Sequence, residues 1–479
     1  TNALRVKVTK SLGTSAANSN TGDAKVAGAI YGIYEDAACT KLVQEVTTDA
    51  SGIAVSDPLE LKDYYVKELV APAGCKIDTA VKPALMSAAK TEANGQKVTT
   101  VTSKDDVIYG GFRMIVSISD LSGNTTKEPA VGSVLKLTLD SDASQSYTAT
   151  VDAQGYADFT DIPYGQYTCT EIEKVKPELD YMDPMPIFIN SEETFIYSKL
   201  VNTEVAQRYI KIEKRDEETG KIIPAANTEF RVVDSNNQTV VQKVMYPNEE
   251  TLYTYKTDAQ GHLVMPEKLP YGEYKIYEVV APDGYYNKSA TENVVAGTFS
   301  VESNTVDNPE KEMVVAVVKN IAQKVNVTVK ATGQVLTGLA SESDAGYTVK
   351  RPVFGGEYMA NIGYKITAKE DIVTLDGTVR MAAGESVTLT TDANGQATTK
   401  LYLGSYTIEQ ITAPEGYVLN TEKEDLLLTY KGQNVKEYNI NNSYSVQKQG
   451  YEVELTKEFK DLLFYRENEN DTAIHAEEN

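Results

Sequence analysis

Three polar side chains in the middle of the chain lie on strands that are otherwise apolar: Lys214 in YIKIEKRD, Glu278 in YKIYEVV and Asn320 in MVVAVVKN. Side chains alternate between the two faces of a strand, so each of the three shares a face with apolar neighbours. Those neighbours are Ile210, Ile212, Tyr274, Ile276, Val280, Val314, Ala316 and Val318. We therefore expect an amine, a carboxyl and an amide to meet in one core, from its first, penultimate and last strands.

Burial gives these three groups a reaction to perform. Removal from water favours the neutral amine of a Lys and the protonated acid of a Glu. A neutral amine is a nucleophile, and a protonated acid polarises an amide and shuttles protons. Attack of the Lys214 amine on the side-chain carbonyl of Asn320, with Glu278 as the catalytic acid, would form an isopeptide bond and release ammonia. The alternative is a buried ion pair that does not react.

The same residue types occur together again near the N-terminus. Lys10 lies on the apolar face of RVKVTK, Glu68 lies in YYVKEL, and VTSKDD supplies two acidic residues as acceptors. We prefer Asp105 over Asp106 because it follows a Lys, as Asn320 does. With an Asp as acceptor, the leaving group is water rather than ammonia. An isopeptide bond between Lys10 and Asp105 is therefore predicted.

Two further sets are incomplete. The set between residues 110 and 204 contains Glu171 and Asn202, but Ile118 occupies the position expected for the Lys. We predict that no bond forms there.

In the last set, Gln410 replaces the Glu, and Glu409 lies one residue out of phase. Asn442 remains at the acceptor position. Alternation places Val329 on the inward face and Lys330 on the outward face, so a bond would need a β-bulge that turns Lys330 inward. We predict a degenerate site, with the state of Lys330 left open.

These four sets belong to an internal repeat. One phrase occurs four times, as YYVKELVAPAGCKID, YGQYTCTEIEKVKPELDY, YGEYKIYEVVAPDGYYN and LGSYTIEQITAPEGYVLN. Each copy is preceded by an Asp-to-Gly turn, in TTDASG, TVDAQG, KTDAQG and TTDANG, and further upstream by an alternating apolar strand. Short runs rich in Val, Ile, Tyr and Thr between such turns are typical of an all-β sandwich. The sequence therefore predicts tandem β-sandwich domains.

We place the four domains at residues 1–109, 110–204, 205–322 and 323–446. Residues 447–479 are predicted to begin a truncated further repeat, because YEVELTKEF resembles a first strand. The alternative for this tail is an amphipathic helix, whose apolar face would contain Phe459, Leu462 and Leu463.

Composition excludes several classes of function. The formal net charge of −23 argues against nucleic acid and anionic membrane surfaces as partners, and no apolar run is long enough for membrane insertion. His262 and His475 are the two histidines of the chain, so His triads and multi-His metal sites are not expected. The Asp-to-Gly turns resemble calcium loops, but Leu403 occupies the position of the bidentate Glu in the last copy. We predict no metal and no cofactor.

Three cysteines cannot staple four domains with disulfides. A disulfide between Cys39 and Cys75 is one interpretation, since Cys75 replaces the Tyr of the APxGY phrase. Cys169 is expected to point outward and to be free. An internal thioester between Cys39 and Gln44 is not supported, because this Cys lies inside an ordinary repeat.

The repeated phrases, together with KEDIVTLDGT, resemble the Cna-B or SpaA-like repeats of Gram-positive pilins and cell-wall surface adhesins. The resemblance implies prealbumin-like or inverse Ig-like sandwiches in an elongated array, autocatalytic intramolecular isopeptide bonds, secretion, and attachment to the cell wall by sortase. No LPXTG-type sorting signal and no pilin-motif Lys in a YPK context occur in this segment, so a polymerising pilin and a monomeric stalk remain alternatives.

Taken together, these features predict an extracellular structural stalk or pilus-shaft protein. Its one reaction would be single-turnover self-crosslinking, so we do not expect an enzyme that acts on an external substrate. The expected partners are neighbouring subunits or domains of the same surface protein. The alternative is an adhesin module that binds a host glycan or matrix protein, most plausibly through the fourth copy and its long insert ATGQVLTGLASESDAGYTVKRPVFGGEY.

Overall fold

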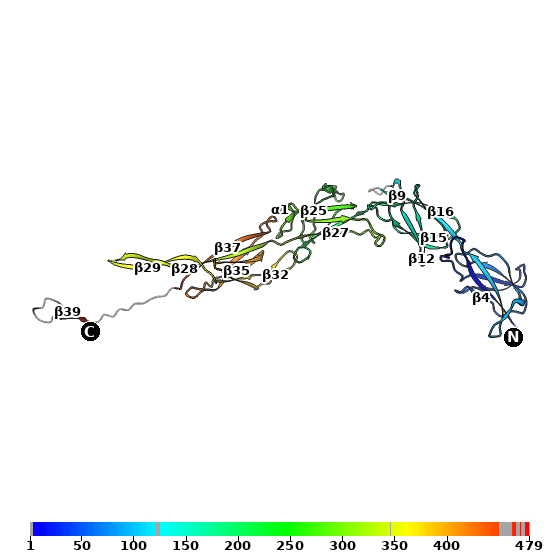
Figure 1. Ribbon diagram of the computed structural model, residues 1–479, viewed down its shortest axis with the longest axis horizontal. Helices are drawn as coiled ribbons and strands as arrows, with labels where there is room; N and C mark the ends of the chain where they lie inside the picture. Colours follow the sequence, from blue (N-terminus) through cyan, green and yellow to red (C-terminus); the bar gives the residue numbers. More distant parts are fainter. Residues whose placement is uncertain are drawn as a thin grey trace.

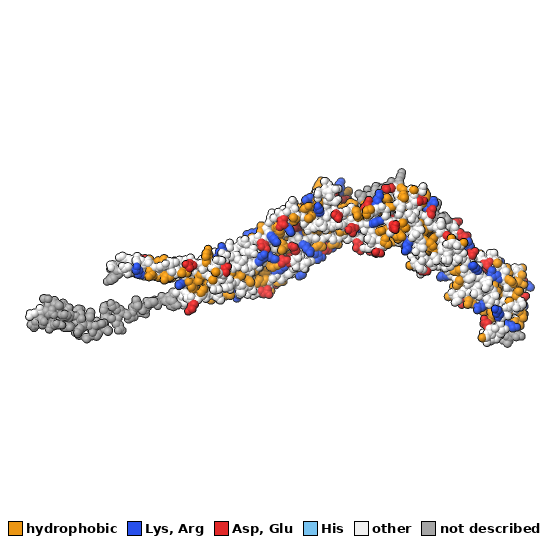
Figure 2. Space-filling view, viewed as in Figure 1, with side chains coloured by type: hydrophobic (Ala, Val, Ile, Leu, Met, Phe, Trp, Pro, Cys, Tyr) orange, Lys and Arg blue, Asp and Glu red, His pale blue; other side chains and the backbone are white. Residues whose placement is uncertain are grey.

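The computed structural model describes residues 3–119, 125–344, 346–449, 462–465, 470 and 475–478. The protein is almost entirely β-structure, and its sheets follow one another along a long, bent rod (Figure 1). The space-filling view shows the same narrow outline, with charged and apolar side chains mixed along its length (Figure 2). The prediction of an elongated all-β array is confirmed. The predicted segments 1–109, 110–204, 205–322 and 323–446 are called the first to fourth repeats.

The first repeat contains two four-stranded sheets. One sheet has the order β4-β1-β8-β7, and the other has the order β3-β2-β5-β6. The first strand, β1, pairs in parallel with β8, the last long strand of the repeat. The elements are β1 (Leu4–Gly13), β2 (Ile30–Tyr34), β3 (Leu42–Thr47), β4 (Ile53–Val55), β5 (Tyr64–Val70), β6 (Lys82–Ala84), the 3-10 helix η1 (Met86–Ala88), β7 (Lys90–Thr91) and β8 (Lys97–Asp106).

The second repeat has the same plan. One sheet has the order β10-β9-β13 with β16 paired in parallel to β9, and the other has the order β12-β11-β14-β15. The strands are β9 (Tyr109–Ser119), β10 (Thr125–Pro129), β11 (Val134–Leu139), β12 (Asp142–Thr150), β13 (Tyr156–Pro163), β14 (Gly165–Glu173), β15 (Met185–Ile189) and β16 (Thr194–Thr203).

The third repeat adds small peripheral elements to this plan. Its main sheets have the orders β23-β18-β27 and β22-β19-β25-β26, and β18 pairs in parallel with β27. The elements are β17 (Gln207–Arg208), β18 (Ile210–Asp216), β19 (Glu229–Val233), β20 (Gln242–Val244), β21 (Glu250–Leu252), β22 (Tyr255–Lys256), β23 (His262–Val264), β24 (Leu269–Pro270), β25 (Gly272–Val280), α1 (Lys288–Glu292), β26 (Gly297–Val301) and β27 (Val314–Asn320).

The fourth repeat contains a long ribbon. Strand β28 pairs with β29, β34 and β37, and β28 and β29 continue beyond the body of the repeat as a two-stranded projection (Figure 1). The strands are β28 (Lys324–Asp344), β29 (Tyr347–Tyr358), β30 (Gly363–Ala368), β31 (Ile372–Val373), β32 (Val379–Met381), β33 (Ser386–Thr390), β34 (Gln396–Tyr402), β35 (Gly404–Thr412), β36 (Glu424–Leu428) and β37 (Glu437–Val446).

The C-terminal tail contains one described hairpin. Strand β38 (Leu462–Tyr465) pairs with β39 (His475–Glu478) in antiparallel fashion. The alternative of an amphipathic helix is therefore wrong for Leu462 and Leu463, while Phe459 and the YEVELTKEF segment lie outside the described residues. The domain boundaries themselves stay predictions.

Each repeat encloses a separate cluster of buried apolar side chains between its two sheets. Alternation is regular along β18, where Ile210, Ile212 and Lys214 are all buried. It fails at the end of β25, where the prediction that Val280 points inward is wrong. A register shift lies between the pairs Glu229–Val280 and Phe230–Glu278. This bulge leaves Val280 40% exposed but keeps Glu278 in the core.

Candidate functional site

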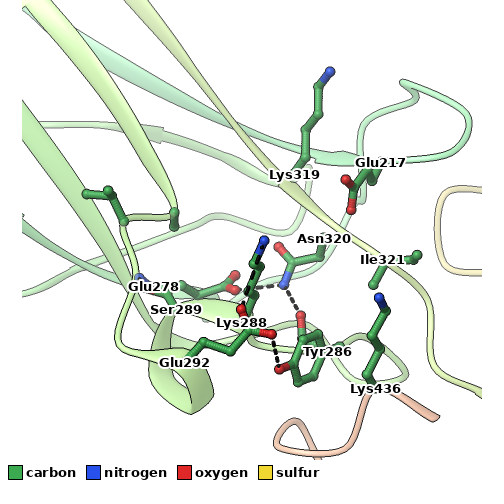
Figure 3. A pocket seen from close by; sticks show the side chains of 12 residues that line it. Glu217, Glu278, Tyr286, Lys288, Ser289, Glu292, Lys319, Asn320, Ile321 and Lys436 are labelled. Carbon is green, nitrogen blue, oxygen red and sulfur yellow. Dashed lines mark hydrogen bonds and ion pairs between the residues drawn. The ribbon is translucent and has the colours of Figure 1, made fainter.

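The third repeat brings Lys214, Glu278 and Asn320 together. They come from β18 and β27, the first and last strands of the two main sheets, and from β25. The expectation that the Glu strand is the penultimate one is wrong, because β26 lies between β25 and β27. Lys214 Nζ lies 2.8 Å from Glu278 Oε1, and both side chains are buried. Asn320 Nδ2 donates a hydrogen bond of 2.7 Å to Glu278 Oε2 (Figure 3). One carboxyl therefore bridges the amine nitrogen and the amide nitrogen.

The amide of Asn320 is held in one orientation. Its Nδ2 also donates to the backbone carbonyl of Tyr286 at 2.8 Å, so both amide hydrogens are used. Its Oδ1 accepts no hydrogen bond within the described part of the chain. An unpartnered buried carbonyl oxygen is costly. Lys214 Nζ and Glu278 Oε1 lie 2.8 Å apart but likewise make no hydrogen bond of good geometry within the described residues. The amine and the amide carbonyl that the reaction would join are therefore both unsatisfied.

The surroundings of Lys214 favour the neutral amine. Complete burial lowers the pKa of Lys214, and the opposing attraction of Glu278 does not restore it. The Nζ atom lies 5.7 Å from the centre of the Phe230 ring, which pairs across the sheet with Glu278. An apolar ring at this place excludes water from the amine and so favours its neutral, nucleophilic form.

A cavity of about 340 Å³ opens beside this cluster. Glu278 and Asn320 lie at its wall, with Tyr286 and Ser289 from the α1 region next to them (Figure 3). The cavity also has Lys436 of the fourth repeat in its lining. The cavity therefore lies on the side of the cluster where the Asn320 amide is.

The first repeat brings Lys10, Glu68 and Asp105 together from β1, β5 and β8. Lys10 Nζ donates to Glu68 Oε1 at 2.7 Å and contacts Asp105 Oδ1. All three side chains are at most 1% exposed. Asp106, the alternative acceptor, is exposed. The preferred assignment of Asp105 therefore agrees with its position beside Lys10.

Two carboxyls beside one amine produce a different charge state from that of the third repeat. Burial lowers the pKa of Lys10, but hydrogen bonds to Asp105 and Glu68 outweigh burial and raise it to about 12. Burial raises the pKa of Asp105 to about 6 in spite of the neighbouring amine, and Glu68 adds to the rise. The Lys10 amine is thus a cation at neutral pH, and it becomes a nucleophile by passing a proton to a neighbouring carboxyl.

The strand register identifies the equivalent positions in all four repeats. In each repeat, one residue of the first strand donates its N–H to the carbonyl of the Gly that closes the Asp-to-Gly turn. The acceptor position on the last strand pairs in parallel with the first-strand residue that lies two places after this donor. The donors to Gly52, Gly155, Gly261 and Gly395 are Lys10, Val116, Lys214 and Ala331.

This register corrects the assignments in the second repeat. The Lys position is occupied by Val116, not by Ile118, and the acceptor position by Thr203, not by Asn202. The pairing of β16 with β9 contains a register shift, so the acceptor position counted along the sequence is not the one that the strand pairing gives. Glu171 does occupy the acid position, where its Oε2 accepts from Ser133 Oγ at 2.5 Å. Burial raises the pKa of this Glu.

The fourth repeat is corrected in the same way. Ala331 occupies the Lys position and Val446 the acceptor position, so Asn442 and Lys330 are both out of place. Sequence alternation put the Lys position at Val329, one inward residue too early. Gln410 occupies the acid position. It pairs with Tyr364 on the neighbouring strand, and the Glu of each other repeat pairs with the corresponding residue of its own neighbouring strand. No amine reaches this core among the described residues.

The three cysteines are free. The interpretation of a Cys39–Cys75 disulfide therefore does not hold in this structure. Cys75 is buried near the Lys10 cluster, and burial raises the pKa of its thiol to about 11. The expectation that Cys169 points outward is wrong, because Cys169 is two residues from Glu171 and shares its inward face. Burial raises the pKa of Cys169 to about 12.

Several residues of the two clusters were not predicted from the sequence. Tyr31 lies opposite Glu68 as Phe230 lies opposite Glu278, and Tyr31 donates to Ser103 Oγ at 2.8 Å beside Lys10. In the sequence, Tyr31 and Phe230 could have been recognised as the aromatic residues on the strand that pairs with the Glu-bearing strand. The Tyr286 carbonyl has no side-chain signature, so only the fold reveals it.

Other kinds of site have no support in the described ranges. Within them, no three His, Cys, Asp or Glu side chains gather as a metal site. Their helices are all too short or too polar to cross a bilayer.

Comparison with known proteins identifies the repeat. The family model SpaA, a prealbumin-like fold domain, matches residues 15–105, 208–309 and 355–444, which together make up more than half of the chain. These matches fall in the first, third and fourth repeats. No curated protein matches the sequence.

Solved structures of Gram-positive proteins resemble the chain at low identity. The Bacillus anthracis TIE protein is 18% identical, with 89% of this chain and 70% of that chain covered and a TM-score of 0.34. BcpA, the major pilin subunit of Bacillus cereus, is 16% identical over 67% of this chain and 100% of its own, with a TM-score of 0.22. A mutant of the shaft pilin SpaA from Lactobacillus rhamnosus GG is 12% identical over 43% and 98%, with a TM-score of 0.20.

Proposed function

Because the chain belongs to the SpaA family of prealbumin-like fold domains, we propose that it is a stalk or pilus-shaft protein whose first and third repeats are closed by isopeptide bonds. We place it outside the cell, on a Gram-positive surface, with neighbouring subunits or domains of the same surface protein as its partners. The observation that carries the proposal is the bridging carboxyl of Glu278, which contacts both the attacking and the leaving nitrogen. The proposed reaction needs no cofactor, and each chain performs it once on its own side chains.

The reaction in the third repeat conserves atoms and charge. Glu278 accepts a proton from Lys214 as Nζ adds to Cγ of Asn320, and then delivers a proton to Nδ2 of the tetrahedral intermediate. The bond between Cγ and Nδ2 breaks, ammonia leaves, and a bond between Nζ and Cγ remains. The cavity beside Asn320 gives ammonia a route to solvent.

In the first repeat, the Lys10 ammonium first passes a proton to Asp105, and the neutral amine then adds to Cγ of the protonated acid. Glu68 accepts the second amine proton and delivers it to the departing hydroxyl. One carboxyl oxygen of Asp105 leaves as water. Lys10 Nζ touches both carboxyls in the unreacted arrangement, so proton transfer and attack need little movement.

Intact mass spectrometry tests the proposal. The bond through Asn320 removes about 17 Da and the bond through Asp105 about 18 Da. The chain should therefore be about 35 Da lighter than its sequence. Lys10→Ala and Lys214→Ala should each abolish one loss. A mass equal to that of the sequence would refute both bonds.

The two bonds should differ in their response to pH. Attack on Asp105 requires its protonated carboxyl together with a neutral Lys10 amine, and the pKa values of these groups are raised to about 6 and about 12. Between these values the pair reaches the reactive form by an internal proton transfer, so the rate in the first repeat should be level above about pH 6. Below about pH 6, Asp105 takes up a proton from solvent while Lys10 stays a cation, so the rate should fall about tenfold per pH unit. Asn320 takes up no such proton and burial lowers the pKa of Lys214, so the rate in the third repeat should change less.

This difference is measured on chain recovered unfolded from inclusion bodies and refolded between about pH 5 and about pH 8. The losses of about 18 and about 17 Da are followed in time in the same sample. Equal pH profiles for the two losses would contradict the assigned role of Asp105.

The corrected register predicts how a bond can be installed in the second repeat. Glu171 is already buried at the acid position. Val116→Lys combined with Thr203→Asn should therefore add a further loss of about 17 Da. The matched control is Ile118→Lys with Asn202 unchanged, which follows the uncorrected register and should add none. A bond in the control but not in the designed pair would show that the register assignment is wrong.

A second candidate function is ligand binding by the ribbon of the fourth repeat. Leu336, Leu339 and Phe354 on β28 and β29 are 51%, 61% and 47% exposed, and clustered exposed apolar residues often mark interaction surfaces. The host ligand would be a glycan or a matrix protein. Arrays of both, probed with the chain and with a variant lacking residues 337–353, test this function. Equal binding by both proteins would exclude the ribbon as the site.

A further inference from the structure

The loop between β25 and α1 determines how Asn320 faces Lys214. Its Tyr286 carbonyl accepts one of the two amide hydrogens of Asn320, and Glu278 accepts the other. A shift of this carbonyl would let the amide rotate about its last side-chain torsion. The angle at which Nζ meets Cγ therefore depends on where this loop, residues 281–287, is held.

A side chain of the fourth repeat holds this loop at both ends. Gln433 Oε1 accepts from the N–H of Ala281 at 2.7 Å, and the Gln433 carbonyl accepts from the N–H of Asn287 at 2.7 Å. The Asn287 side chain also donates to Gln433 Oε1, at 3.3 Å. Between these points, the Tyr430 hydroxyl donates to the Tyr285 carbonyl at 3.2 Å. Tyr286 thus lies in a segment whose flanks are bonded to the next repeat.

The clamping segment, residues 430–436, is itself fixed. Gln323, at the junction of the repeats and 1% exposed, accepts from the N–H of Lys431 at 2.9 Å. Its Nε2 donates to the carbonyls of Gly432 and Val435 at 3.1 and 2.7 Å. The clamp therefore has a defined position relative to β27, which ends at Asn320 and leads into Gln323.

The opposite side of the cluster is held by the fourth repeat as well. Asp216, two residues after Lys214 on β18, pairs with Asn320 and is completely buried. It accepts from Tyr285 OH at 2.8 Å and from Arg380 Nη2 at 2.9 Å. Arg380 belongs to β32 of the fourth repeat. The strand that presents the amine and the loop that orients the amide are thus tied to one neighbour.

We propose that the fourth repeat, which lacks the bond-forming residues, positions the amide for bond formation in the third, with Gln433 as the positioning residue. The inference rests on the proposed bond between Lys214 and Asn320. It makes crosslinking of the third repeat dependent on docking of the next one. The first repeat, whose cluster makes no contact with Gln433, serves as an internal standard in every molecule.

The test is the time course of mass loss after the full-length chain is refolded from denaturant. Gln433→Ala should slow the loss of about 17 Da at least about tenfold, because small displacements of reacting groups are costly in rate. The loss of about 18 Da in the same molecules should be unchanged. Gln433→Glu retains an acceptor oxygen for Ala281 and Asn287 but loses the donation of Nε2 to the Val279 carbonyl at 3.3 Å, so its rate should lie between those of Gln433→Ala and the unmodified chain.

Gln334→Ala is the matched control, because the Gln334 side chain accepts from the N–H of Lys448, outside the third repeat, while its backbone carbonyl accepts from Tyr417 OH. It should leave both rates unchanged. Tyr430→Phe removes one hydroxyl and no carbon, and should slow the loss of about 17 Da alone. Equal rates of that loss in Gln433→Ala and the unmodified chain would overturn the inference. Its absence from the unmodified chain would instead overturn the proposed bond, and the inference with it.

Discussion

Pulled from its two ends, the chain will unfold in two steps rather than four. Tension enters each repeat through its first strand and leaves through its last, and these strands are the parallel pairs β1–β8 and β18–β27 in the two complete repeats. A covalent bond from Lys214 to Asn320 carries the load past every residue between them. The first and third repeats then cannot extend unless a covalent bond breaks.

Single-molecule force spectroscopy measures this directly. The second and fourth repeats should each lengthen by on the order of 30 to 40 nm, as expected for about 95 to 125 residues drawn out at about 3.5 Å each. Lys214→Ala should add a third step of similar size, and Lys10→Ala combined with it a fourth. Four steps in the unmodified chain would show that the repeats are not closed.

The second large effect is expected from Glu278→Ala. The carboxyl that bridges the two nitrogens is lost, so the loss of about 17 Da should disappear. The open chain also loses the restriction that a closed loop of about a hundred residues places on the unfolded state, about 4 to 5 kcal/mol. Lys214 in addition remains buried without its partner. The free energy of unfolding of the third repeat should therefore fall by at least that amount, as measured by urea denaturation.

Glu171→Ala is the matched control for this effect. Glu171 is equally buried, but its partners are Ser133 Oγ and the N–H of Met182 rather than an amine. Its removal should change no mass and cost about 1 to 3 kcal/mol, the usual effect of leaving buried hydrogen-bonding groups unpaired. Similar losses of stability in the two variants would argue that Glu278 acts as a buried polar group and not as part of a bond-forming cluster.

Strand alternation accounts for most of what the sequence predicted about the two clusters. A Lys that alternates with Ile210 and Ile212 must point inward when those residues do, and the same logic applied to Glu278 and Asn320. The logic fails where a strand contains an extra residue. A bulge turned Val280 outward, and the β16–β9 pairing of the second repeat contains a register shift. In the fourth repeat alternation holds, and the error was to choose Val329 instead of Ala331 among the buried residues of one strand.

The Lys position could not be counted along the sequence. The Gly that closes each Asp-to-Gly turn bonds to the residue at this position, but the two are 42, 39, 47 and 64 residues apart in the four repeats, so the hydrogen bond in the fold is what identifies Val116 and Ala331. The contacts of Gln433 and Arg380 could not have been found from the sequence either. They join residues more than 140 positions apart across two repeats, and Gln433 and Arg380 lie outside the repeated phrases.

The most direct test of the two proposed bonds is the identification of branched peptides after proteolysis. Digestion followed by tandem mass spectrometry should yield one peptide pair joined through Lys214 and Asn320, lighter by about 17 Da than its two parts. A second pair should be joined through Lys10 and Asp105, lighter by about 18 Da. Linear, unmodified peptides containing Lys10, Lys214, Asp105 and Asn320 in full yield would contradict both bonds.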